Sequence, residues 1–287
     1  MHTEYAKTIL SAENGMNLYR GCTHGCIYCD SRSECYQFTH DFADTACKEN
    51  APELLEQALR SKRRRCMIGT GSMSDPYQPA EQERRLTRRA LELILQYGFG
   101  AAVLTKSDLV LRDLDLLEQI NREQKAVVQM TLTTFDESLC RILEPGVCTT
   151  ARRFEVLQTM QAHGIPTVVW LTPVLPFLND TEENLRGILQ YCIEAGVKGI
   201  VCFDMGVTLR AGSREYFYAA LDRHFPGIRQ RYEQKYGEAY IVNSPRNAEL
   251  MRLFHGICEE HGILHRPEAV FAYLKELPPA FEQLSLF

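Results

Sequence analysis

Three cysteines lie close together near the start of the chain, with a spacing that suits a metal centre. Cys22, Cys26 and Cys29 form the pattern C-x3-C-x2-C, and Tyr28 directly precedes the third of them. Three thiolates on one loop can bind three irons of a cubane [4Fe–4S] cluster, which normally has four cysteine ligands. The fourth iron would then keep an open coordination position for an exogenous ligand. The spacing therefore predicts a [4Fe–4S] cluster held by these three cysteines.

Two other kinds of thiol site compete with a cluster. A structural zinc site usually combines C-x2-C with a second Cys/His pair further along the chain. No such pair follows, and His24 is poorly spaced for the purpose. A redox-active dithiol needs only two cysteines. We favour the cluster, and a zinc site or a purely structural group of thiols remains as the alternative.

The composition is that of a globular protein of 287 residues, with 45% apolar and 24% charged residues. No apolar run approaches the roughly 20 residues that a membrane span needs, and no basic-then-apolar leader opens the chain. We therefore expect a soluble, cytoplasmic protein with no membrane contact. Its eleven cysteines are then expected to be reduced thiols. The net charge of −5 argues against broad, nonspecific binding of nucleic acid.

Short apolar runs alternate with amphipathic stretches over the first 205 residues, as in repeated βαβ units. This alternation predicts an α/β fold with a parallel sheet of six strands, a partial (β/α)6 barrel of the TIM type. Side chains that do chemistry should then gather where the strands end. The predicted strands are 16–20, 66–70, 101–105, 127–133, 167–172 and 199–203, and the predicted helices are 52–63, 79–97, 109–121, 151–163 and 181–195.

The pattern changes after Phe203, where four helical stretches follow one another without intervening strands. We expect these at residues 213–224, 228–236, 247–261 and 267–277. The sequence therefore predicts two parts: a barrel core over 1–205 and a helical C-terminal extension over 206–287 that packs on the core.

The cysteine triplet resembles the signature of the radical S-adenosylmethionine (SAM) enzymes, and the predicted partial barrel is similar to the fold of that family. The resemblance covers roughly residues 14–205. It implies two cofactors, a [4Fe–4S] cluster and SAM, with SAM chelating the open iron. In that family an electron from the reduced cluster cleaves SAM to methionine and a 5′-deoxyadenosyl radical, which abstracts a hydrogen atom from the substrate.

Further stretches resemble the spore photoproduct lyase-like branch of this family, in the same order along the chain. They follow the predicted strands, where a barrel site would be built. Within the branch, the chain is similar to the B member of a mobile gene pair that encodes two radical SAM proteins. The stretches are SDPYQP at 74–79, TKS at 105–107, TLTTFD at 131–136, LEP at 143–145 and PVLPFLND at 173–180.

The resemblance also implies residues that contact SAM. Lys106, a cation at a strand end, is suited to the methionine carboxylate, and Ser74 and Asp75 to the methionine amino group. Each also has a plainer interpretation, since Ser-Asp-Pro is a common turn and Lys106 can be a solvated strand end. Four further residues complete the expected SAM site. Tyr28 and the main chain around Val174 are expected at the adenine, and Thr131 contributes its hydroxyl. Arg153 is expected as a carboxylate or ribose partner, although the helical pattern around Arg153 looks exposed.

One position departs from the spore photoproduct lyases, which carry a hydrogen-returning cysteine in the loop after the second strand. The matching residue here is Ser72, whose O–H bond is too strong for that role. Asp30 stands where those lyases have a tyrosine, and Cys35 is a candidate replacement thiol. Repair of thymine dimers is therefore not the expected reaction, and no residue is assigned to hydrogen transfer.

We therefore predict a radical SAM enzyme that abstracts a hydrogen atom from a nucleic acid, a nucleoside or a small metabolite. The alternative is a radical SAM maturase that modifies a protein or peptide, and a third possibility is a non-enzymatic Fe–S electron-transfer module. An enzyme of this kind needs an external one-electron reductant similar to flavodoxin or ferredoxin. The mobile-pair resemblance adds a second radical SAM protein as a partner.

Overall fold

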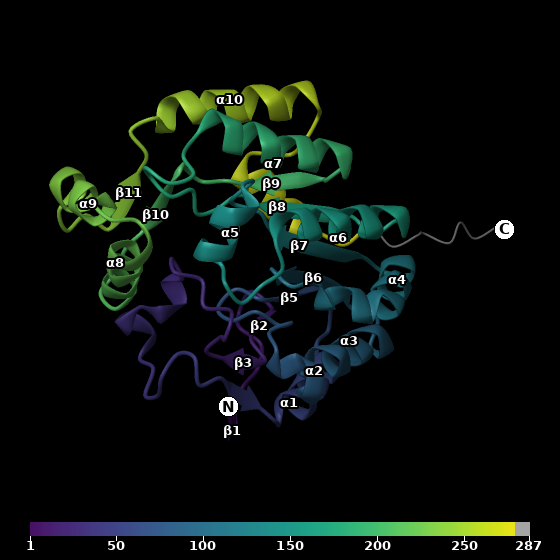
Figure 1. Cartoon of the computed structure of the whole chain (residues 1–287). Helices are drawn as coiled ribbons and strands as arrows, with labels where there is room; N and C mark the ends of the chain where they lie inside the picture. Colours follow the sequence, from purple (N-terminus) through teal and green to yellow (C-terminus); the bar gives the residue numbers. More distant parts are fainter. Residues whose placement is uncertain (279–287) are drawn as a thin grey trace.

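A sheet of six parallel strands forms the centre of the computed structural model, which describes residues 1–278 (Figure 1). Successive strands lie side by side in the order β2-β5-β6-β7-β8-β9, so the chain adds each new strand at one edge. The predicted α/β fold with six parallel strands, a partial barrel, is confirmed. The strands are β2 (Gly15–Met16), β5 (Met67–Thr70), β6 (Gly100–Thr105), β7 (Ala126–Thr131), β8 (Thr167–Trp170) and β9 (Gly199–Val201).

Amphipathic helices cover the outer face of this sheet. Their apolar stripes and the outward-facing strand residues, such as Val103, Val128 and Val169, form the largest hydrophobic core. Because successive residues of a strand point to opposite faces, every second residue enters this core. In Figure 1 these helices lie along one side of the strands: α1 (Ala51–Ser61), α3 (Leu86–Gln96), α4 (Leu114–Glu123), α6 (Thr150–Ala162) and α7 (Glu182–Glu194).

The inner face of the sheet is closed at one end by the last described helix, α11 (Pro267–Lys275). Its Val270 and Leu274 pack with Ala102, Val127 and Val168, which occupy the inward-facing positions at the start of the strands. The side chains of this group are apolar and buried. The N-terminal end of the barrel is therefore filled with packed side chains.

The C-terminal extension is more varied than the predicted run of helices. Two short strands, β10 (Gly206–Thr208) and β11 (Ile241–Asn243), pair in antiparallel fashion and were not predicted. The expected helices are present as α8 (Ser213–His224), α9 (Ile228–Tyr236), α10 (Asn247–Glu260) and α11. Residues 279–287 of the predicted extension lie outside the described residues. The division at residue 205 stays a prediction.

The predicted first strand, residues 16–20, divides between two sheets. Tyr19 and Arg20 form β3, which pairs with β4 (Ala46–Lys48), and β4 also pairs with β1 (His2–Glu4). The chain leaves the barrel at Asn17, whose side chain accepts a hydrogen bond from Met73 N at 3.0 Å. A single continuous strand was therefore wrong, because this residue is used to hold the loop after β5.

The predicted helix over 79–97 is broken into α2 (Ala80–Arg84) and α3. Arg85 takes a left-handed backbone conformation with φ of 53° between them. The buried Glu81 carboxylate accepts hydrogen bonds from the main-chain N–H groups of Thr87 and Arg88, which are the free donors at the start of α3. The remaining helices are the 3-10 turns η1 (Asp30–Arg32), η2 (Glu34–Tyr36) and η3 (Asp108–Asp113), and α5 (Glu137–Leu143). Among the described residues, no helix has the length and apolar character to cross a membrane.

Candidate cluster and cofactor site

A cavity of about 470 Å³ opens at the C-terminal end of the parallel strands. The loop after β3 brings Cys22, Cys26 and Cys29 to one wall, and the ends of β6 and β7 bring Lys106 and Thr131 to another. Chemistry-bearing side chains were predicted to gather where the strands end, and the cavity lies there. It faces away from the end that α11 fills.

The cysteine loop is held in place by main-chain contacts behind it. Cys22 N donates a hydrogen bond to Phe42 O at 3.0 Å. Gly21 has a φ of +84°, and a Cβ there would meet the same carbonyl oxygen at 2.4 Å, so only glycine fits. Gln78 donates to Gly21 O at 3.2 Å and accepts from Thr23 N at 3.3 Å. The loop is therefore held in shape by contacts within the protein.

The three thiols suit a polynuclear cluster better than a single metal ion. One tetrahedral ion with Zn–S bonds of about 2.3 Å needs its sulfur ligands within about 4 Å of one another. Among the described residues, these sulfurs do not form a group that lies within 4.8 Å, although all three border the cavity. Burial raises the pKa of the Cys22 thiol to about 12. A buried thiol of this kind ionises when a cationic metal centre compensates the charge.

Asp75 connects the loop after β5 to the end of β6. Its carboxylate accepts hydrogen bonds from Thr105 Oγ1 at 2.6 Å and from Lys106 N at 2.7 Å. The buried His24 places Nδ1 3.5 Å from the same carboxylate, and burial lowers the pKa of this imidazole. Ser74 Oγ donates to Tyr19 O at 2.8 Å. Ser74 and Asp75 both line the cavity, as expected, and both also fix the loops that form it.

Lys106 lines the cavity with an ammonium group that the protein does not use. Within the described residues, Lys106 Nζ has no hydrogen-bond partner, and it lies 5.8 Å from the centre of the Tyr28 ring. Burial lowers the pKa of this lysine, but the Cys26 thiolate and the Glu144 carboxylate raise it more, so it is raised overall. The cation is thus stabilised and still able to bind an anionic group in the cavity.

Glu144, from the LEP stretch, lies beneath the wall that carries Tyr28. Its carboxylate accepts a hydrogen bond from the Tyr28 hydroxyl and forms an ion pair with Arg153 Nη2 at 2.5 Å, both partners being fully buried. Burial raises the pKa of Glu144, but the charges of Arg153 and Lys106 lower it below its ordinary value. Glu144 is therefore a buried anion that holds the aromatic residue of the cysteine motif, a role not predicted from the sequence.

Arg153 differs from its expected surroundings. It lies in α6, is 0% exposed, and donates to Cys148 O at 2.9 Å and to Thr131 O at 3.0 Å, besides pairing with Glu144. The expectation of an exposed helix position was wrong. Among the described residues, the cavity wall does not include Arg153. Its role as a partner of the SAM carboxylate or ribose stays a prediction. Its contacts are those of a support for the end of β7.

Of the remaining predicted SAM contacts, Thr131 lines the cavity and Val174 does not. Thr131 is buried and lines the cavity. Val174 is buried behind the wall, where its N–H donates to Gly206 O at 3.2 Å, while the preceding Thr172 and Pro173 reach the cavity. The main chain around Val174, expected at the adenine, therefore borders the cavity through Pro173 and Thr172 and not through Val174 itself.

The positions that depart from spore photoproduct lyases also have defined places. Ser72 and Asp30 line the cavity. Asp30 is held by the Tyr36 hydroxyl, which donates to it at 3.0 Å. Cys35 lies on the surface, where its sulfur is 3.3 Å from Arg210 Nη1. Within the described residues, the cysteines that border the cavity are the three of the C-x3-C-x2-C motif.

Several lining residues were not identified from the sequence. Phe203 follows β9, and its position at a strand end was an available signal. Val207, Thr208, Ile241 and Asn243 come from β10 and β11, which the sequence pattern did not reveal. The extension therefore contributes part of the cavity wall through this strand pair.

Comparisons with known proteins agree with this site. A family model described as the Radical SAM superfamily matches residues 16–192. An uncharacterized protein of Mycobacterium tuberculosis is 32% identical over 248 residues, spanning 83% of this chain and 71% of that protein. Spore photoproduct lyase in complex with dinucleoside spore photoproduct is similar in fold, with a TM-score of 0.64, 15% identity, and coverage of 86% of this chain and 74% of that chain. The methyltransferase TsrM from Kitasatospora setae, with cobalamin and a [4Fe–4S] cluster bound, has a TM-score of 0.53 and 12% identity over 86% of this chain and 51% of that chain.

Proposed function

The chain belongs to the radical SAM superfamily, and on that premise we propose that it abstracts a hydrogen atom from an organic substrate bound in the cavity. It is a radical SAM enzyme with a [4Fe–4S] cluster and SAM as cofactors. When both are bound, the reduced cluster supplies the electron that cleaves SAM to methionine and the 5′-deoxyadenosyl radical. The observation that carries the proposal is the meeting at one cavity of three cysteines and Lys106, whose ammonium has no hydrogen-bond partner among the described residues.

Each wall of the cavity has a distinct part in this proposal. Cys22, Cys26 and Cys29 would bind the cluster on the loop that Gln78 supports from behind. Lys106 would bind the methionine carboxylate, because a cation without a protein partner gains most from an anionic ligand. Ser74, Asp75, Tyr28 and the Thr131 hydroxyl are proposed to complete the SAM site, with Arg153 and Val174 supporting the walls from behind.

The outer part of the cavity favours a substrate with a flat apolar surface and polar edges. Phe203 and Ile241 are 53% and 60% exposed there, beside the polar side chains of Asn243 and Thr208. A nucleobase or an aromatic metabolite combines these features, since bases stack on apolar side chains and hydrogen-bond at their edges. We therefore propose a nucleic acid, a nucleoside or a small metabolite. The dinucleoside bound to the structurally similar lyase supports this choice.

A second candidate is a maturase that modifies a protein or peptide. The observation that favours it is the same exposed apolar pair, Phe203 and Ile241, because such side chains also receive apolar peptide residues. In either case, Ser72 in place of a hydrogen-returning cysteine supports a reaction other than dimer repair. The third possibility, an electron-transfer module, would leave Lys106 without a ligand.

The enzyme requires a substrate and an external electron source. We propose a one-electron reductant similar to flavodoxin or ferredoxin, and a second radical SAM protein as a functional partner. All eleven cysteines are free thiols, which supports our expectation of the reducing cytoplasm.

The test is cluster-dependent release of 5′-deoxyadenosine. Protein reconstituted without oxygen is incubated with SAM and dithionite, and the product is measured by mass spectrometry. The C22A/C26A/C29A variant should lose all release, whereas C35A/C66A, which removes two cysteines outside the cavity wall, should retain it. Release that is equal in both variants contradicts the proposal. A loaded cluster with no release and no SAM-induced change in its EPR spectrum favours the electron-transfer module.

A further inference from the structure

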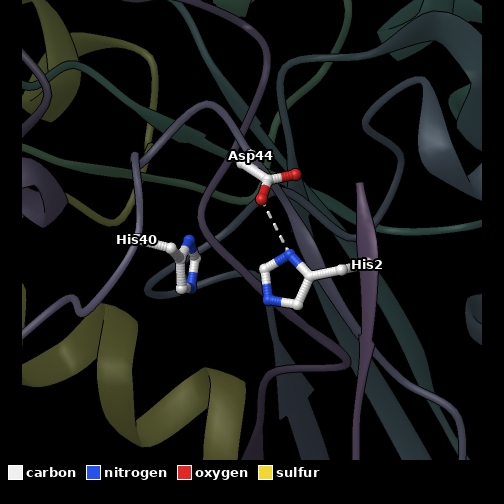
Figure 2. A group of neighbouring side chains, drawn as sticks. All are labelled: His2, His40 and Asp44. Atoms are coloured by element: carbon white, nitrogen blue, oxygen red, sulfur yellow. Dashed lines mark hydrogen bonds and ion pairs between the residues drawn. The ribbon is translucent and has the colours of Figure 1, made fainter.

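A second group of metal-binding side chains lies at the surface, apart from the cavity. His2, His40 and Asp44 each contribute one ring nitrogen or carboxylate oxygen, and these three atoms lie within 4.8 Å of one another (Figure 2). Figure 2 shows the two imidazole rings beside each other, with the Asp44 carboxylate near both. Imidazole and carboxylate are ordinary ligands of Zn²⁺. We propose that these three side chains bind a zinc ion, at a site separate from the cluster.

Backbone hydrogen bonds fix the segments that carry these ligands. His2 belongs to β1, and its N–H donates to Thr45 O at 3.1 Å, so Asp44 lies beside it. A turn centred on Asp41 fixes the other side of the site. Its carbonyl accepts from Asp44 N at 2.9 Å, and its carboxylate accepts from Ala43 N at 2.8 Å.

His40 has the proton arrangement of a metal-bound histidine. Its Nδ1 lies 2.8 Å from Asp41 O, and a carbonyl only accepts hydrogen bonds, so Nδ1 carries the proton. The other nitrogen, Nε2, therefore keeps a lone pair. That atom is buried and has no hydrogen-bond partner within the described residues. Metal-binding histidines characteristically donate one N–H to a carbonyl or carboxylate and present the other nitrogen to the metal.

Side-chain rotations separate this arrangement from a coordinated one. The ammonium group of Met1 lies 2.5 Å from Asp44 Oδ1, which leaves Oδ2 for the metal. His2 Nδ1 and Asp44 Oδ2 are 2.9 Å apart, and a tetrahedral zinc ion with bonds of about 2.0–2.1 Å keeps its ligands about 3.3 Å apart. Because all three atoms lie within 4.8 Å of one another, no separation has to shorten by more than about 1.5 Å. Binding at His2 Nδ1 would break its hydrogen bond to Asp44 and leave the single N–H of the imidazole on Nε2. Three protein ligands leave a fourth position for water.

The site adjoins the support of the cysteine loop. Phe42 lies between His40 and Asp44, and its carbonyl oxygen accepts the hydrogen bond from Cys22 N at 3.0 Å. A zinc ion at His40 and Asp44 would hold both flanks of this residue and join them to β1 through His2. The proposed role is therefore structural, because it stabilises the segment that carries Phe42.

The test is zinc binding by the cluster-loaded protein. One equivalent of Zn²⁺ is added without oxygen, and bound metals are measured after buffer exchange. Wild type should retain one zinc per chain besides its iron, and H2A and H40A should each weaken zinc binding at least 100-fold. H163A is the matched control, because His163 also lies near a carboxylate, with Nδ1 2.7 Å from Glu118, but has no third ligand.

X-ray absorption at the zinc edge identifies the ligands independently of the variants. Nitrogen and oxygen neighbours at about 2.0–2.1 Å, with no sulfur at about 2.3 Å, are expected. Sulfur neighbours would place the zinc at the cluster cysteines and overturn the proposal. The proposal is also refuted if wild type retains no zinc, or if H40A and H163A bind it equally. Release of 5′-deoxyadenosine is not required in any of these measurements, so they are independent of the proposed function.

Discussion

Two lysines at opposite ends of neighbouring strands show how the two ends of the barrel differ. Lys106 follows β6 at the cavity, and within the described residues its ammonium has no hydrogen-bond partner. Lys125 precedes β7 at the closed end and donates to Tyr273 O at 2.5 Å and Glu276 O at 2.8 Å, at the end of α11. Cations satisfy the free carbonyl groups at the end of a helix. Lys125 is therefore occupied by the fold, whereas Lys106 is available to a ligand.

The pKa shifts of the two lysines follow the same division. Burial lowers the pKa of Lys125, and the nearby Glu276 carboxylate only partly offsets this. The pKa of Lys106 is also lowered by burial, yet the anionic groups around the cavity raise it overall. The comparison teaches that residue type and depth do not distinguish a binding lysine from a structural one. The presence or absence of a protein partner does.

The largest expected effect is a loss of stability on replacing Arg153, a cation near the cavity that, like Lys125, is paired with protein groups. Arg153→Met would leave the buried Glu144 carboxylate without its ion-pair partner. We expect a loss of about 3–5 kcal/mol in the free energy of unfolding, measured by denaturant titration. SAM affinity of the folded fraction should change little. The E144Q/R153M double variant should recover part of the stability, and a selective loss of SAM binding by R153M would instead make Arg153 a ligand contact.

Lys106→Met should have the next largest effect, on binding and not on folding. Removing a cation that pairs with the methionine carboxylate should weaken SAM binding about 100-fold, as for other buried charge pairs. Isothermal titration of cluster-loaded protein without oxygen measures this change, and thermal unfolding should be nearly unaltered. The K106R variant keeps the charge and serves as the control. Unchanged SAM affinity in K106M would remove the distinction drawn between the two lysines.

Lys125→Met should produce the opposite result. It removes hydrogen bonds to the main-chain carbonyls of Tyr273 in α11 and of Glu276 just after it, which should destabilise the protein by about 2 kcal/mol. SAM affinity should stay at the wild-type value, because the substitution lies at the closed end. Lys198→Met is the matched control, since Lys198 is exposed and lies 5.8 Å from the same Tyr273 ring. Equal melting temperatures for K125M and K198M would contradict this prediction.

The smallest effect is expected for the hydroxyl of Tyr28. Tyr28→Phe removes one donor from the buried Glu144 carboxylate and should cost about 1–2 kcal/mol of stability, with little change in SAM affinity. Tyr97→Phe removes a similar hydrogen bond to Glu56 near the surface and should have a smaller effect, because water replaces the lost donor. Unfolding curves of the two variants measure the difference. A larger loss in Y97F would show that burial of the carboxylate does not determine the cost.

The sequence predicted those elements whose apolar period is sustained. The parallel strands after the first, and the outer helices other than the one predicted over 79–97, were found because apolar residues recur within each at the spacing typical of the element. β10 and β11 were missed because their pairing joins Gly206 to Asn243, a contact between distant segments that local patterns do not contain. The break at Arg85 was missed because a buried carboxylate from Glu81 ends one helix and begins the next.

The candidate site was predictable where a sequence motif indicates a particular chemistry. The C-x3-C-x2-C spacing identified the cysteines, and the resemblance to the spore photoproduct lyase-like branch pointed to Ser74, Lys106 and Thr131, which the structure brings to one cavity. The burial of Arg153 was not predictable, because the preceding residue of the same helix, Arg152, is also an arginine and is exposed. Its partner Glu144 lies nine positions earlier on a separate segment, so only the tertiary structure brings the charges together.

The helix α11, which fills the closed end with Val270 and Leu274, has a kinetic consequence. With that end filled, we expect cofactor and substrate to enter at the opposite end of the strands, where the exposed Phe203 and Ile241 line the cavity. The ligand nearest the cysteine loop then has to arrive first and depart last. Turnover should consequently follow a compulsory order, in which the altered substrate leaves before 5′-deoxyadenosine and methionine can be exchanged for a new SAM molecule.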